Sequence, residues 1–124
     1  MVLIDTNIIV DLIAGDKQII ALLNKLVEKE EIKTSTITEY ELLKHKNRLK
    51  KQLAEDFLSE IIICPFDRAA ARKSALLFNK LKESGKMINE NDLLIAGICL
   101  ANDEVLLTRD QKFGNIDDAN IKIV

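Results

Sequence analysis

The stretch that most constrains how this chain can fold is its first seven residues, MVLIDTN. Residues 2–4 are a short apolar run with β-branched side chains, which is typical of a strand buried on both faces in the middle of a parallel sheet. The run ends on Asp5, and Thr6 and Asn7, two N-cap residue types, precede apolar residues at helical spacing. We therefore expect Asp5 at the carboxyl edge of a central strand, where open α/β sheets bind their ligands.

The length of 124 residues suits one domain, spanning residues 1–124, with one well-filled core. No apolar run reaches the roughly 18 residues of a transmembrane helix, and the amino terminus lacks a secretory signal pattern. We therefore expect a cytoplasmic protein without a membrane partner. Cys64 and Cys99 lie among apolar residues and predict small buried thiols, not a zinc site or a disulfide.

Strand and helix patterns alternate along the whole chain. Strands are expected over residues 2–4, 32–35, 61–64, 105–108 and 121–124, the third of them buried. Helices are expected over residues 6–13, 19–27, 38–49 with a second piece over 50–59, 67–84, and from Asn89 or Asn91 to 101. The helix over 67–84 should bury a face made of Ala71, Ala75, Leu77, Phe78 and Leu81. This alternation implies right-handed crossovers and an α/β fold with a parallel sheet.

Four acidic residues are expected at the carboxyl edge of that sheet. Asp5 and Asp110 each follow a strand. Glu41 and Asp92 fall in the first turns of helices that begin at the same edge. By contrast, residues 103 and 104, both acidic, precede a strand and should lie at the opposite edge.

Carboxylates that converge on one cleft repel one another unless a cation lies between them. Oxygen ligands without His or Cys favour hard cations, Mg²⁺ or Mn²⁺. Such a site suits phosphodiester hydrolysis, in which the metal generates the nucleophile and stabilises the departing oxygen. The sequence thus predicts a divalent-metal hydrolase.

Each acid also has a purely structural interpretation. Glu41 fits a capping box with Thr38, accompanied by a hydrophobic staple between residues 37 and 42. Asp92 could complement the dipole of its helix, which would leave Glu90 as the ligand. The other two acids could simply begin a helix and a turn. Both interpretations stay open for each acid at the level of sequence.

The densest positive segment is residues 44–51, in a chain whose net charge is −2. That net charge does not favour a nucleic-acid binder, so any phosphate binding must be local. The segment is either a solvated face or a surface that holds a nucleic-acid backbone near Glu41. Its candidate contacts are Lys44, Lys46, Arg48, Lys50 and Lys51. His45, the only histidine, is expected to be a solvated residue on the same helical stretch.

Four short motifs resemble those of the PIN-domain nucleases, and within them the small stand-alone VapC-type toxins. The motifs are LIDTN at 3–7, S-x-x-T-x-x-E-L at 35–42, DLLIA at 92–96 and LTRD-x-x-F at 107–113. They occur in the order of the family and cover almost the whole chain. The resemblance implies a three-layer α/β/α sandwich with strand order 3-2-1-4-5, whose first and fourth strands are neighbours.

The resemblance also implies a Mg²⁺- or Mn²⁺-dependent endoribonuclease, held inactive by a cognate antitoxin and usually homodimeric. Its acidic positions fall on Asp5, Glu41, Asp92 and Asp110, and its supporting polar positions on Thr6, Asn7 and Thr108. Many relatives carry a fifth acid where this chain has Lys112, which leaves open whether one or two metal ions bind. The alternatives are an RNA-processing PIN nuclease outside a toxin–antitoxin pair and a catalytically silent PIN-like scaffold.

Overall fold

All 124 residues are described in the computed structural model, whose centre is a five-stranded parallel sheet. The strands are β1 (Val2–Ile4), β2 (Ile32–Ser35), β3 (Ile62–Cys64), β4 (Val105–Thr108) and β5 (Ile121–Ile123). Their order is β3-β2-β1-β4-β5, and every neighbouring pair is parallel. The predicted α/β fold and strand order are confirmed, with β1 in the centre and β4 beside it.

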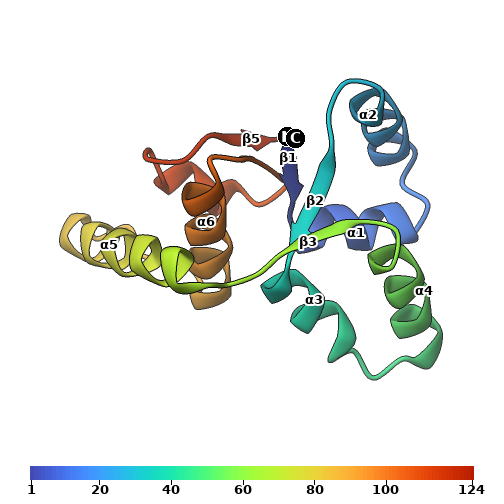
Figure 1. The fold of residues 1–124 in the computed structure, drawn as a ribbon, viewed down its shortest axis with the longest axis horizontal. Helices are drawn as coiled ribbons and strands as arrows, with labels where there is room; N and C mark the ends of the chain where they lie inside the picture. The colour runs from blue at the N-terminus through green and yellow to red at the C-terminus, as the bar shows by residue number, and fades with distance from the viewer.

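Helices cover both faces of the sheet and give three layers (Figure 1). On one side lie α1 (Thr6–Ile13), α2 (Lys17–Val27), α3 (Thr36–Leu43) and α4 (Arg48–Leu58). On the other lie α5 (Arg68–Ser84) and α6 (Glu90–Asn102), followed before β5 by the 3₁₀ helix η1 (Gln111–Asn115). Figure 1 shows α3 continuing beyond the edge at which β2 ends, while α4 returns towards the sheet. None of the helices is long and apolar enough to cross a membrane.

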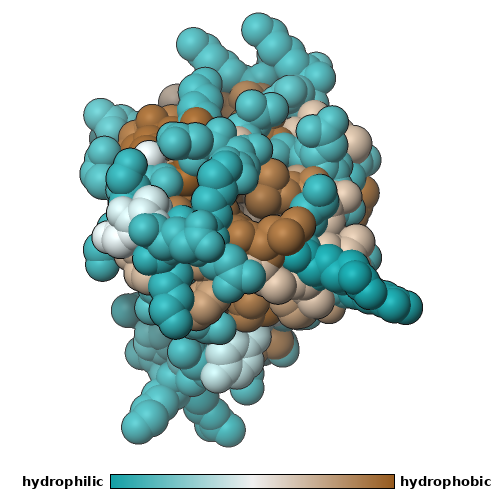
Figure 2. Space-filling model, turned by 90° about the vertical axis from the view of Figure 1, so that its left-hand side faces the viewer, coloured by the Kyte–Doolittle hydropathy of each residue, from teal (hydrophilic) through white to brown (hydrophobic).

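The alternation of side chains along the central strands divides the core into two clusters. Leu3 and Leu106 belong to a cluster of 14 buried residues under α5 and α6. Ile4 and Leu107 belong to a cluster of 10 buried residues under the helices of the other side. Cys64 and Cys99 are buried in the first cluster as free thiols, as predicted. Viewed from the α5–α6 side, polar side chains cover most of the surface around a limited apolar patch (Figure 2).

Two predictions about burial were wrong. β3 is an edge strand, and its Ile62 is 49% exposed, because only β2 pairs with it. In α5 the buried face consists of Ala70, Ser74, Leu77 and Leu81, whereas the predicted Ala71 and Ala75 are exposed. The reason is the partner helix: α5 crosses α6 where Gly97 of α6 faces Ala70 and Ser74, so small residues set the contact.

The predicted helix over residues 38–49 was also wrong in its extent. The segment divides into α3, which ends at Leu43, and α4, which begins at Arg48. Asn47 caps α4 by accepting a hydrogen bond from the backbone N–H of Lys50 at 3.0 Å. His45 therefore lies in the connection between two helices and not on a helix, although it is exposed as expected.

The crossing of α5 and α6 yields a stability prediction. A Cβ atom at Gly97 would overlap Ser74 Oγ and lie 3.0 Å from the carbonyl oxygen of Ala70. We expect Gly97→Ala to lower the free energy of unfolding by about 1–3 kcal/mol, as overpacking does, in denaturant titrations. Adding Ser74→Ala should recover part of the loss, because it removes the overlapping hydroxyl, which is buried without a partner.

Gly114→Ala is the matched control for this experiment. A Cβ atom at Gly114 meets nothing closer than 3.9 Å, so its effect should stay within about 0.5 kcal/mol. Equal costs for the two alanine substitutions would contradict the proposed helix contact.

Candidate active site

Asp5 lies at the end of β1, only 3% exposed, and is fixed by three hydrogen bonds. Its backbone N–H donates to the carbonyl of Leu107 at 2.9 Å. Its Oδ1 accepts from the backbone N–H of Thr6, and its Oδ2 accepts from Thr108 Oγ1, both at 2.8 Å. Asp5 is itself the N-cap of α1, not Thr6 or Asn7. Burial is the largest effect on its pKa, which is raised, and the charges of Glu41 and Asp110 add to the rise.

Glu41 lies in the second turn of α3, one turn further from the helix start than predicted. Ser35 is the N-cap of α3, because its Oγ accepts from the backbone N–H of Thr38 at 3.1 Å. The predicted capping box between Thr38 and Glu41 is therefore wrong. Glu41 Oε1 instead accepts a hydrogen bond of 2.7 Å from Thr6 Oγ1, which joins α3 to the first residue of α1.

Asp92 lies in the first turn of α6, whose N-cap is Asn89. Burial raises the pKa of Asp92 to about 6, and the neighbouring charges of Asp5, Asp110 and Glu41 contribute in that order. Lys112 offsets part of this rise. Glu90, in the same turn, is exposed. Asp92 is therefore the acid of this turn whose pKa is raised by the charges of the other three acids.

Asp110 follows β4 and caps η1, where its Oδ1 accepts from the backbone N–H of Lys112 at 2.9 Å. Thr108, which is fully buried, joins this turn to the end of β1. Its hydroxyl donates to Asp5 and accepts from the backbone N–H of Asp110 at 3.0 Å. The turn interpretation of Asp110 is thus correct, and it is compatible with a position beside the other acids.

A cluster around Arg109 was not anticipated from the sequence. Its guanidinium bonds Asp11 at 3.0 Å and Asp16 at 2.9 Å, and Asp16 is the N-cap of α2. The backbone N–H of Arg109 donates to Asn7 Oδ1 at 3.3 Å, so the predicted polar role of Asn7 is to hold this turn. Arg109 lies inside the fourth motif, but its partners are 98 and 93 residues away in the chain. The spacing of residues within a motif cannot predict ion pairs over such separations.

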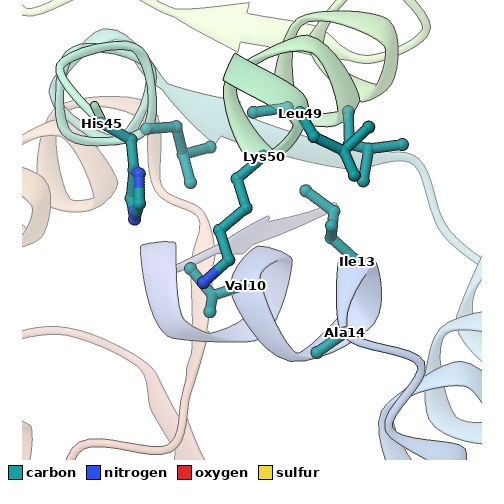
Figure 3. Close-up of a pocket in the computed structure, with 9 residues that line it drawn as sticks. Val10, Ile13, Ala14, His45, Leu49 and Lys50 are labelled. Carbon is teal, nitrogen blue, oxygen red and sulfur yellow. The ribbon is translucent and has the colours of Figure 1, made fainter. Parts of the chain in front are cut away.

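The basic candidates all lie on the exposed surface, in the connection after α3 and in the first turn of α4. Two of them have a defined local environment. The ammonium of Lys44 lies 5.1 Å from the centre of the Tyr40 ring. Lys50 lies at a mostly apolar groove of about 330 Å³ between α1 and α4. Figure 3 shows its side chain extending across the opening towards Val10, with His45 at one side.

The donor chemistry of the four acids can be compared with what a divalent cation requires. No group of three or more Asp, Glu, His or Cys side chains is arranged closely enough to hold an ion by itself. Mg²⁺, however, usually takes only one or two carboxylates and keeps several waters. The set contains oxygen ligands alone, and the pKa of Asp92 is raised first by burial and then by the negative charges of Asp5, Asp110 and Glu41. These residues fit a partly hydrated Mg²⁺ or Mn²⁺.

Known proteins with similar sequences and structures have the same fold as this chain. The PIN domain family profile matches residues 2–119. This chain belongs to the PIN-domain family. Ribonuclease VapC19 of Mycobacterium tuberculosis is 32% identical over 109 residues, which cover 87% of each protein. The resemblance found in the four motifs is confirmed.

Two solved structures show how closely this PIN domain follows its relatives. A chain in the complex of VapBC2 from Rickettsia felis, bound to a DNA fragment from its promoter, superposes with a TM-score of 0.90 at 28% identity, covering 100% of this chain and 99% of that one. VapBC-1 from nontypeable Haemophilus influenzae gives 0.85 at 27% identity, with 99% and 98% covered.

The raised pKa of Asp92 predicts an unusual pH dependence for this PIN domain. In the folded chain Asp92 titrates near 6, against 3.8 for its ordinary value, so between these pH values the folded state binds more protons than the unfolded state. Stability in EDTA should therefore contain a contribution that falls as pH rises from about 4 to 6. Asp92→Asn, which cannot ionise, should abolish that contribution and melt higher than wild type at pH 7.5.

The control for this experiment is Glu90→Gln, which changes the exposed acid in the same helical turn. Melting curves at pH 4.5 and 7.5 should show the wild-type pH dependence for Glu90→Gln. If Asp92→Asn keeps that pH dependence as well, the titration of Asp92 is not its cause, and the predicted repulsion among the four acids at Asp92 is contradicted.

Proposed function

We propose that this PIN domain is a Mg²⁺- or Mn²⁺-dependent endoribonuclease that hydrolyses RNA phosphodiester bonds at Asp5, Glu41, Asp92 and Asp110. The observation that carries the proposal is the placement of the four acids at the carboxyl edge of the sheet, where the Thr6 hydroxyl joins Glu41 to the residue after Asp5. The pKa of Asp92, raised by burial and by the charges of the other three, agrees with this placement. Lys112 offsets only part of the negative charge of these carboxylates, and they lie at the edge of a parallel sheet where ligands bind, so they are a candidate cation site. The name of the relative VapC19, a ribonuclease, supports RNA as the substrate.

The chain's own residues act by holding the acids in place. The four acids would hold a divalent cation, which when bound would supply an activated water and stabilise the departing oxygen. Thr108 and the backbone N–H of Thr6 hold Asp5, and the Thr6 hydroxyl holds Glu41. The turn from Thr108 to Asp110 is held through Asn7. Fixed carboxylates need little reorganisation when charge develops on the scissile phosphate.

The proposed partners follow from the relatives and from the exposed basic segment. Both superposed structures are VapBC complexes, so we propose that this chain is the toxin of a toxin–antitoxin pair and binds a cognate antitoxin. We further propose a homodimer, as the family resemblance implies. The basic residues beyond α3 are proposed to hold the RNA backbone, since Figure 1 places this connection beyond the edge at which β2 ends.

The proposed reaction predicts strict dependence on a divalent cation. Purified protein should cleave RNA with Mg²⁺ or Mn²⁺ and stop in EDTA, because carboxylates alone do not activate water near neutral pH. Asp5→Asn and Asp92→Asn should each remove most of the cleavage, measured on labelled RNA, while Glu90→Gln keeps it. Full activity in EDTA, or in either Asn variant, would overturn the proposal.

A separate prediction concerns the basic segment. Changing Lys46 and Lys51 to Gln should weaken RNA binding for all sequences and reduce the slope of log K against log salt by about 0.7 per lost contact on a single strand. The measurement is fluorescence anisotropy in EDTA at several salt concentrations. Lys25→Gln with Lys29→Gln, near the end of α2, is the charge-matched control. Equal slopes for both pairs would make the basic segment a solvated face.

A further inference from the structure

Three hydroxyl groups form a continuous line that ends on Glu41, and we call this line the hydroxyl chain. Ser35 Oγ lies 3.3 Å from Thr38 Oγ1, and Thr38 Oγ1 lies 3.0 Å from Thr6 Oγ1. Thr6 Oγ1 in turn lies 2.7 Å from Glu41 Oε1. Ser35 and Thr38 are both fully buried.

The direction of these hydrogen bonds follows from counting hydrogens. A hydroxyl has one hydrogen to donate, and an ionised carboxylate can only accept. The hydrogen of Thr6 therefore goes to Glu41, so Thr38 must be the donor between the two threonines. Ser35 is then the donor to Thr38, while its own oxygen accepts the backbone N–H of that residue. All three O–H bonds point along the chain towards Glu41.

We propose that Thr38, supported by Ser35, is a positioning residue for Glu41. Thr38 donates to Thr6 and thereby leaves the Thr6 hydroxyl oriented towards the carboxylate. Thr38 and Glu41 lie three residues apart on one face of α3, whereas Thr6 begins α1, so the hydroxyl chain sets how the two helices meet at this acid. The inference rests on the proposed divalent-cation site, because groups that hydrogen-bond to metal ligands orient those ligands.

Thr38→Val keeps the shape of the side chain and removes the hydroxyl, and Thr38→Ser keeps the hydroxyl. Thr34 is a matched control. It lies in β2, the strand directly before α3, and is also fully buried. Its hydroxyl donates to the carbonyl of Ile4 at 2.8 Å and has no hydrogen bond to a carboxylate. Thr34→Val therefore removes a comparable buried hydroxyl outside the hydroxyl chain.

The first measurement uses metal-free protein and does not depend on the proposed function. Thr38→Val should lower the melting temperature of the wild-type chain at least twice as much as it lowers that of Glu41→Ala, where the end of the hydroxyl chain is missing. Thr34→Val should have the same effect in both backgrounds. If the effects of Thr38→Val and Glu41→Ala add, Thr38 does not act through Glu41 and the proposal fails.

The second measurement is Mn²⁺ binding by titration calorimetry. Thr38→Val should weaken Mn²⁺ binding about 10-fold or more, the usual effect of losing a partner of a metal ligand, and Thr38→Ser should restore it. Thr34→Val should keep wild-type affinity. Coupled melting temperatures with unchanged Mn²⁺ affinity would reduce Thr38 to a packing role and overturn the proposal. A wild-type chain that binds no Mn²⁺ would overturn the proposed function instead. The melting temperatures alone would then show whether Thr38 acts through Glu41.

Discussion

The burial of one carboxylate at the end of the central strand is the constraint on which the rest of this structure depends. Removing Asp5 from water is costly, and the cost is offset by the N–H of Thr6 and the hydroxyl of Thr108. The first donor belongs to the first residue of α1, so Asp5 is also the N-cap of that helix. The second requires β4 to lie beside β1, because Thr108 is its last residue. The start of α1 and the adjacency of the two strands therefore both meet at Asp5, where each supplies one of its donors.

Glu104 and Asp92, at opposite edges of the sheet, differ in how their negative charge is compensated. At the amino edge, the buried Glu104, which directly precedes β4, accepts a hydrogen bond of 2.9 Å from the half-buried Lys33 of β2. The bond to Glu104 raises the pKa of Lys33. At the carboxyl edge, Asp92 meets other acids and only a partial offset from Lys112. Glu104 thus has a direct cationic partner, whereas Asp92, at the edge where a cation is proposed to bind, has only a partial offset, as expected when function conflicts with stability.

Much of this arrangement could be predicted from local patterns, and the errors have a common origin. The apolar run before Asp5 and the alternation of strands and helices predicted a parallel sheet and the edge at which the acids lie. The order of the strands came from the family resemblance. The cap of α3 was placed on Thr38, because Ser35 and Thr38 both suit an N-cap and local spacing does not separate them. In α5 the predicted Leu77 and Leu81 are buried, but Ala71 and Ala75 are each one residue away from the buried Ala70 and Ser74, which face Gly97 of another helix. The bond between Thr6 and Glu41 spans 35 residues, beyond any local pattern.

Capping and cation binding, which compete as interpretations of the sequence, are compatible in the structure. A carboxylate has about four lone-pair sites on its two oxygens. Asp5 uses one on each oxygen for the hydrogen bonds that fix it, and Asp110 uses one of its four for the N–H of Lys112. Sites therefore remain on both acids after the caps are made. Because the caps remove rotational freedom from these side chains, the remaining sites have fixed directions before any ligand arrives. A capping aspartate at the carboxyl edge of a parallel sheet is for this reason a suitable starting point for a metal ligand.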